Sequence, residues 1–140
     1  MIIEICSQTM ALELAATAQT KTSVISITSK EYADLVFPDN QYILSVLHLK
    51  FNDLTEEYDE EGIPYGRPLP KQEDFTGLRE FINALHCDRL IIHCYEGTSR
   101  SAAVAKAVYE YRGCKDEIHS HRGISPNPLV YSLACRELKS

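Results

Sequence analysis

Residues 93–101 read HCYEGTSRS; they follow the apolar run Leu90–Ile92 and precede the alanine-rich stretch Ala102–Tyr111. A short run that is almost wholly apolar is typical of a central parallel strand covered on both faces, and an alanine-rich stretch favours a helix. The residues between them are mostly short, and Gly97 can adopt backbone conformations that are closed to other residues. The stretch therefore predicts a strand, a tight loop and a helix in direct succession, which is the repeating unit of α/β folds.

Strand and helix patterns alternate along the rest of the chain. We expect strands where apolar and β-branched residues concentrate, at 2–6, 22–29, 42–51 and 89–93. We expect helices where apolar residues recur at helical spacing or alanine and leucine prevail, at 8–17, 71–85, 99–112 and 127–138, with a helical turn at 31–36. This alternation predicts an α/β fold: a single compact domain over residues 1–140, with a central, mostly parallel sheet flanked by helices.

Segment 52–70 interrupts the alternation, because it is rich in glycine and proline and shows no periodic pattern. It carries an acidic cluster, formed by Glu56, Glu57, Asp59, Glu60 and Glu61. A compact domain seldom contains so long an irregular connection unless it is a functional lid or mobile. An acidic run of this kind is usually a solvated loop, and beside an active site it would repel polyanionic substrates.

The composition restricts the class of protein. A chain of 140 residues is long enough for one domain with a proper core. No stretch approaches the roughly 20 apolar residues that span a bilayer, and Met1–Glu4 lacks the basic start of a secretory signal. The net charge of −6 argues against nucleic acid and anionic membranes as partners. Five cysteines without zinc-type spacing suit a reduced setting, so we expect a cytoplasmic protein.

The loop after the strand has the chemistry of an oxyanion site. Its backbone can curl until several N–H groups point inward as a nest, and the helix that begins near Ser99 adds the positive end of its dipole. Arg100 can close over a bound anion with a planar, two-pronged donor. In such surroundings the pKa of the Cys94 thiol should fall, so that it is a thiolate at neutral pH. The alternative for Cys94 is a buried structural cysteine.

Stretch 93–101, in the pattern H-C-x-x-G-x-x-R-S, resembles the active-site signature of the cysteine-dependent protein tyrosine phosphatases, and its S-R-S ending is closest to the dual-specificity branch. Residues 125–127, read as SPN, resemble the proline–asparagine pair at the start of the final helix in that branch. The resemblance covers about the last two thirds of the chain. It implies a phosphatase-type phosphate loop between strand and helix, and hydrolysis of phosphate monoesters through a phosphocysteine intermediate.

The resemblance also assigns roles to single residues. Cys94 would be the nucleophile, and the phosphate would be held by Tyr95, Glu96, Gly97, Thr98, Ser99 and Arg100. Three residues would support the loop. His93 points the other way along the strand and would orient it, Ser101 could offer its hydroxyl to the sulfur, and Asn127 would brace it from the last helix. No cofactor or metal is expected, because the loop itself supplies the positive field. His119 and His121 lack further ligands nearby, and such a pair is more often part of a surface loop than a metal site.

The leaving group of a phosphate ester needs a proton, and this family takes it from an aspartate on a separate loop. Asp53 is the first candidate, because it ends a predicted strand and so should lie on the same sheet edge as Cys94. Asp59 is the second and Asp74 the third, since the usual dual-specificity spacing puts the aspartate nearer the cysteine. Asp53 could instead be a turn residue that bonds to its own backbone after Asn52.

We expect a phosphorylated protein, phosphotyrosine above all, or a small phosphate monoester as substrate. The sequence does not choose between them. One rival hypothesis is a catalytically silent module of the same fold that binds phosphate or phosphoproteins. Another is a sulfurtransferase or arsenate reductase, because a cysteine and an arginine separated by five residues recur in those enzymes as well.

Overall fold

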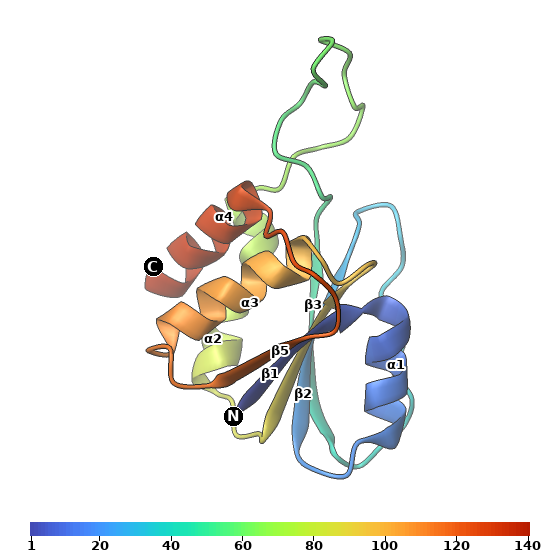
Figure 1. Ribbon diagram of the computed structural model, residues 1–140, viewed down its shortest axis with the longest axis vertical. Coiled ribbons are helices and arrows are strands. Elements are labelled where there is room, and N and C mark those ends of the chain that lie inside the picture. The colour runs from blue at the N-terminus through green and yellow to red at the C-terminus, as the bar shows by residue number, and fades with distance from the viewer.

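Five strands form one sheet in the order β3-β2-β4-β1-β5 (Figure 1). The computed structural model describes residues 1–140. The strands are β1 (Ile2–Ser7), β2 (Thr22–Thr28), β3 (Ile43–Lys50), β4 (Arg89–Cys94) and β5 (Glu117–Ser120). Every neighbouring pair is parallel, so the predicted α/β fold is confirmed, with a wholly parallel rather than a mostly parallel sheet.

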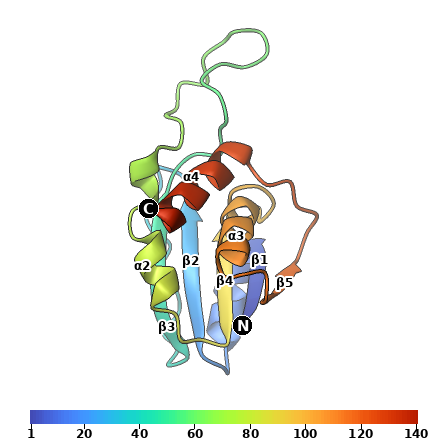
Figure 2. The same ribbon diagram turned by 90° about the vertical axis from the view of Figure 1, so that its left-hand side faces the viewer.

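Helices cover both faces of the sheet (Figures 1 and 2). They are α1 (Gln8–Thr17), α2 (Leu78–Asn83), α3 (Arg100–Tyr111) and α4 (Pro128–Lys139), with the short 3-10 helix η1 (Gln72–Phe75) before α2. Helix α1 lies alone on one face, where it covers a small apolar cluster around Cys6 and Val24. The other three lie on the opposite face over the main core of 22 buried residues. This unequal cover makes the face of α2, α3 and α4 the principal source of hydrophobic stability.

Strand β4 lies between β1 and β2, with Cys94 opposite Ser7 and His93 opposite Ser26. The chain leaves β1 for α1 on one face and leaves β4 for α3 on the other, so the connections that follow these two neighbouring strands go to opposite faces of the sheet (Figure 1). Such a point opens a crevice at the sheet edge, where α/β proteins bind ligands. The loop between β4 and α3 begins at this edge of the sheet.

The predicted elements agree with the structure within two residues at each end, except at three places. The expected helix 71–85 is split into η1 and α2, because Gly77 between them has a φ of 93°, which is left-handed. The expected helical turn at 31–36 is irregular, and Lys50 holds it through the carbonyl oxygen of Tyr32 and an ion pair with Asp34 at 3.0 Å. Strand β5 was not predicted.

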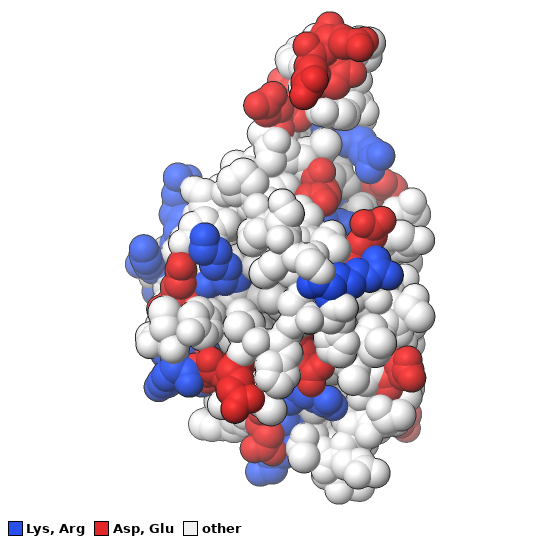
Figure 3. Space-filling model, in the orientation of Figure 1, with Lys and Arg blue, Asp and Glu red and all other residues white.

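Residues Asp53–Pro70, hereafter the arm, project from the sheet edge as an extended loop (Figures 1 and 2). Its two branches meet in an antiparallel bridge between Tyr58 and Pro64. At its base the Asn52 side chain donates a hydrogen bond to the carbonyl oxygen of Pro68 at 3.2 Å. The acidic cluster lies at the tip of the arm (Figure 3). None of the helices combines the length and the apolar character needed to span a bilayer.

Candidate active site

The loop from Cys94 to Arg100, hereafter the Cys94–Arg100 loop, is packed against the end of β1. Gly97 has a φ of 78°, and a Cβ atom there would lie 2.3 Å from the carbonyl carbon of Cys6 and 2.5 Å from the nitrogen of Ser7. No side chain fits this space, so both the left-handed backbone and the close approach require glycine. The first residue of α1 adds a contact, since the Gln8 N–H donates to the carbonyl oxygen of Tyr95 at 3.2 Å.

The Cys94 thiol is buried and surrounded by donors. Its Sγ atom accepts the Gly97 N–H at 3.3 Å and lies 3.2 Å from the Ser101 hydroxyl. Burial opposes ionisation, but the hydrogen bonds from Ser101 and Gly97 and the charge of Arg100 outweigh it, and the pKa of the Cys94 thiol is lowered. A thiol of this kind is a better nucleophile at neutral pH than a buried structural cysteine.

The Arg100 guanidinium is held through one nitrogen and lacks a hydrogen-bond partner at another. Its Nη1 donates to the Ser29 hydroxyl and to the carbonyl oxygen of Phe51, both at 3.0 Å. Its Nε is buried and has no hydrogen-bond partner. A buried donor without an acceptor costs about 1–3 kcal/mol, so an anion that accepts this N–H would be stabilised at once. Phe51 and Ser29 directly follow β3 and β2, and the ends of these strands thus orient the guanidinium.

Three helices begin around the Cys94–Arg100 loop (Figure 1). Helix α3 starts at Arg100 itself, and α1 starts at Gln8, whose N–H contacts the loop. Helix α4 follows Asn127, whose N–H donates to the carbonyl oxygen of Ser99 at 3.2 Å. The positive ends of three helix dipoles therefore favour an anion at this place.

His93 faces the α1 side of the sheet, away from Cys94. Its Nδ1 lies 3.3 Å from the carbonyl oxygen of Cys94 and its Nε2 lies 2.7 Å from the Ser26 hydroxyl. A carbonyl only accepts, so Nδ1 carries the hydrogen and Nε2 accepts from Ser26. Burial lowers the pKa of His93 to about 4, against the hydrogen bond to Cys94 and with help from the charge of Arg100. At neutral pH the ring is therefore neutral and supports the loop from behind.

The three candidate acids have different surroundings. Asp53 lies at the Cys94–Arg100 loop, where its Oδ1 accepts hydrogen bonds from the Ser99 hydroxyl and from Asn127 Nδ2, both at 2.8 Å. Asp59 lies towards the tip of the arm, where its Oδ1 accepts the N–H groups of two residues of the same turn at 2.9 Å. Asp74 pairs with Lys30 at 2.8 Å, and its side chain is 4% exposed. Only Asp53 is in reach of the loop.

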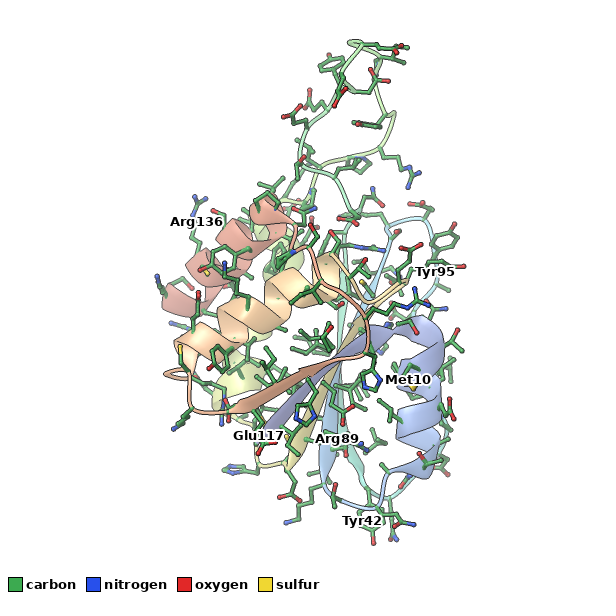
Figure 4. All side chains as sticks on the ribbon, in the orientation of Figure 1. Met10, Tyr42, Arg89, Tyr95, Glu117 and Arg136 are labelled. Atoms are coloured by element: carbon green, nitrogen blue, oxygen red, sulfur yellow. The ribbon has the colours of Figure 1, made fainter.

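The other predicted residues of the loop are less enclosed. Tyr95 and Glu96 are exposed, and Tyr95 extends outward near the start of α1 (Figure 4). Thr98 is half-buried, and its carbonyl oxygen accepts the Ser125 N–H at 2.8 Å. Ser125 and Asn127, which precede α4, thus brace the loop through main-chain hydrogen bonds.

A cavity of about 590 Å³ opens beside Arg100. Its walls come from the segment after β2, with Tyr32, Leu35 and Val36, and from Tyr95 on the loop; the arm contributes Arg67. This wall was not expected from the sequence. The sequence marked only the strand that precedes this segment; the pairing of that strand with β4, which brings the segment beside Arg100, depends on the fold.

No group of three or more histidine, cysteine, aspartate or glutamate side chains is arranged to hold a metal ion. His119 lies in β5 and pairs with Glu117 at 3.4 Å, whereas His121 pairs with Glu4 at 2.8 Å. The two histidines thus have separate partners.

No protein-family model, curated protein or solved structure matches the chain. The likeness to a phosphatase therefore rests on the residues of the Cys94–Arg100 loop and on their surroundings, and the activity is a proposal.

Proposed function

We propose that the protein is a phosphate monoester hydrolase of the protein tyrosine and dual-specificity phosphatase type, acting through a phosphocysteine intermediate. One observation carries the proposal: on a single loop, a buried thiol of lowered pKa stands near a buried guanidinium whose Nε has no partner. The thiolate supplies a nucleophile, and the free donor supplies a partner for a phosphate oxygen. A structural cysteine would need neither.

In the first step the Cys94 thiolate attacks phosphorus, and the bond between phosphorus and the ester oxygen breaks. Arg100 and the inward N–H groups of the loop stabilise the charge on the three remaining oxygens. Asp53 gives its proton to the departing oxygen, so an alcohol or phenol leaves.

In the second step a water molecule attacks the phosphocysteine, and Asp53, now ionised, takes its proton. The bond between phosphorus and sulfur breaks, inorganic phosphate leaves, and the thiolate is restored. Ser101 lies 3.2 Å from the sulfur and can donate to it as negative charge returns. No redox partner or metal enters either step, and a thiolate enzyme of this kind is suited to the reducing cytoplasm.

The residues that line the cavity beside Arg100 are suited to binding the aromatic ring of a leaving group. The side chains of Tyr32, Leu35 and Val36 offer apolar surface, and Tyr95 offers an exposed ring at the mouth. A phosphorylated protein, with phosphotyrosine as the first candidate, or a small aryl phosphate would place its ring there. The acidic tip of the arm disfavours polyanions.

The test is hydrolysis of p-nitrophenyl phosphate by the wild-type protein, Cys94→Ser and Asp53→Asn over the acidic to mildly alkaline pH range. Cys114→Ser, an exposed cysteine remote from the loop, is the matched control. We expect turnover that EDTA leaves unchanged and vanadate inhibits. Cys94→Ser should abolish it, Asp53→Asn should remove its basic limb, and Cys114→Ser should change neither.

Two outcomes would overturn the proposal. A Cys94→Ser protein with a rate near that of the wild type would exclude the phosphocysteine. A wild-type protein that binds vanadate without turning over any ester would instead be a silent phosphate- or phosphoprotein-binding module.

A further inference from the structure

Two of the three charged side chains that line the cavity beside Arg100 are arginines, although the chain as a whole carries a net charge of −6. The three are Arg100 from α3, Arg67 from the arm and Asp34 from the segment after β2. Lys50 compensates the Asp34 carboxylate through an ion pair at 3.0 Å. Arg100 serves the proposed phosphate site, so Arg67 is a second cation of the cavity that the proposed reaction does not use.

The main chain next to Arg67 is fixed by Asn52, whose side chain is buried. The Asn52 Nδ2 donates to the carbonyl oxygen of Pro68 at 3.2 Å, and its Oδ1 accepts the Lys30 N–H at 3.3 Å. One buried amide thus ties the end of the arm to the segment after β2, which forms the apolar wall of the cavity. This tie holds Arg67 beside that wall.

The Arg67 guanidinium forms one ion pair, with the Glu31 carboxylate at 3.7 Å. This distance is longer than the roughly 2.7–2.9 Å of a strong hydrogen bond between a cation and a carboxylate. Both side chains are about half exposed, at 58% and 47%, and water screens such pairs so that they contribute little to stability. The carboxylate of a bound ligand could therefore replace Glu31 at Arg67 at small cost.

The cavity has the size of a site for a ligand with several chemical groups. Its volume of about 590 Å³ lies within the range of about 300–1,000 Å³ for pockets that enclose a drug-sized molecule. Arg100 offers a partner for the phosphate, the wall after β2 offers apolar surface for a ring, and Arg67 offers a partner for a further anionic group.

We propose that Arg67 binds a carboxylate carried by the leaving group of the phosphate ester and exchanges Glu31 for it. This inference rests on the proposed hydrolase function and adds a specificity-determining residue to it. The leaving group would be a phosphotyrosyl polypeptide with aspartate or glutamate beside the phosphotyrosine, or a small phenol with a carboxyl group. A single carboxylate is not a polyanion, so this preference agrees with the repulsion of polyanions by the acidic tip of the arm.

The test compares esters in matched pairs. One pair is a phosphotyrosyl peptide with glutamate directly beside the phosphotyrosine and the same peptide with glutamine there. The other pair is 3-carboxyphenyl phosphate and 3-carbamoylphenyl phosphate. The readout is the ratio of kcat/KM for the anionic ester to that for its neutral partner, in the wild type, Arg67→Gln and Glu31→Gln. Arg136→Gln, on the exposed side of α4 (Figure 4), removes the same charge elsewhere and is the matched control.

For at least one pair, we expect this ratio to be roughly two- to fivefold higher in the wild type than in Arg67→Gln, which is the range of exposed ion pairs. Arg136→Gln should keep the ratio of the wild type. Glu31→Gln should raise it, because the substitution removes the carboxylate that competes for Arg67. Added salt should lower the ratio in the wild type, since it screens the exposed pair. The pair that shows these effects identifies the source of the carboxylate, a polypeptide or a small ester.

Three outcomes would overturn the inference. Ratios that Arg67→Gln leaves unchanged in both pairs would assign Arg67 to holding the arm against the wall, while leaving the hydrolase in place. An equal rise from Glu31→Gln with and without Arg67→Gln would show that Glu31 repels the ligand directly and that no exchange at Arg67 occurs. Absence of wild-type turnover on all four esters would overturn the hydrolase and this inference together.

Discussion

The Cys94–Arg100 loop and the arm both follow a strand at the same edge of the sheet, but they differ in almost every other respect. The loop is enclosed by β1, α1, α3 and the residues before α4, and its Cys94 and Arg100 side chains are buried. The arm projects into solvent and is held together mainly by its own turn and one bridge (Figures 1 and 3).

The difference between the two regions gives two aspartates of the same segment different surroundings. Asp53 and Asp59 belong to the same segment and have the same chemistry, but only Asp53 is close enough to the sheet to receive donors from the loop and from α4. Asp59 uses its Oδ1 to close a turn. Distance from the strand end, and not the residue type, decides which carboxylate reaches the Cys94–Arg100 loop.

The largest expected effect concerns the Arg100 guanidinium and its unpartnered Nε. Arg100→Lys keeps the charge but loses the planar fork, the two bonds of Nη1 and the unpartnered Nε. Removal of one such donor costs about 10²–10³-fold in rate, and we expect at least this loss in kcat/KM for p-nitrophenyl phosphate. Arg136→Lys, on the exposed side of α4 (Figure 4), is the control. An Arg100→Lys protein close to wild type would show that charge alone suffices.

Two glycines with nearly the same backbone conformation allow a direct comparison of the loop and the arm. Gly97 in the loop has a φ of 78° and no room for a Cβ, whereas Gly62 in the arm has a φ of 80° and open space around it. Alanine at either site meets the left-handed penalty of about 1–2 kcal/mol, and at Gly97 overpacking adds about 1–3 kcal/mol. Urea unfolding should therefore show a larger loss for Gly97→Ala than for Gly62→Ala. Equal losses would mean that the end of β1 can move aside.

The succession of strand, loop and helix could be predicted from the sequence because its signals are local. An apolar strand, Gly97 and an alanine-rich helix stand next to one another in the chain, and the parallel sheet they imply was confirmed. The same reasoning about strand ends predicted that Asp53 would lie on the edge of Cys94. The structure places it there, next to Ser99.

Features that depend on distant contacts could not be predicted in this way. Strand β5 has four exposed residues and exists because it pairs with β1. The break at Gly77 is hidden by apolar spacing that continues across it, and the amide of Asn127 gives no sign in the sequence that it reaches Asp53. The segment Ser29–Val36 forms a wall of the cavity only because β2 lies beside β4, and its own sequence does not reveal this position.

After the glycine substitutions, the next expected effect in size concerns His93 and the dependence of the free energy of unfolding on pH. The pKa of His93 is lowered from 6.5 to about 4, so the folded protein binds the proton less readily than the unfolded chain. The neutral His93 ring makes its full contribution to the free energy of unfolding above pH 6.5. This contribution is lost as the pH falls towards 4, and the loss is roughly 3 kcal/mol in total. Urea unfolding at a series of pH values should show this decline in the wild type, and His93→Asn should show a shallower one. Parallel curves would exclude His93 as the cause.

The smallest expected effect comes from the tip of the arm. In Asp59→Asn the amide oxygen can still accept both N–H groups of the turn, so the tip should keep its shape. The change removes one charge from the half-buried Asp59 of the acidic cluster, and substitutions at the surface usually shift the free energy of unfolding by no more than about 0.5 kcal/mol. We therefore expect kcat/KM to stay close to that of the wild type. Asp53→Asn removes the proposed proton donor and should lose the basic limb of the pH profile that Asp59→Asn keeps. A pH profile that changes in Asp59→Asn and not in Asp53→Asn would move the acid to the arm, and the contrast between the two regions would then be reversed.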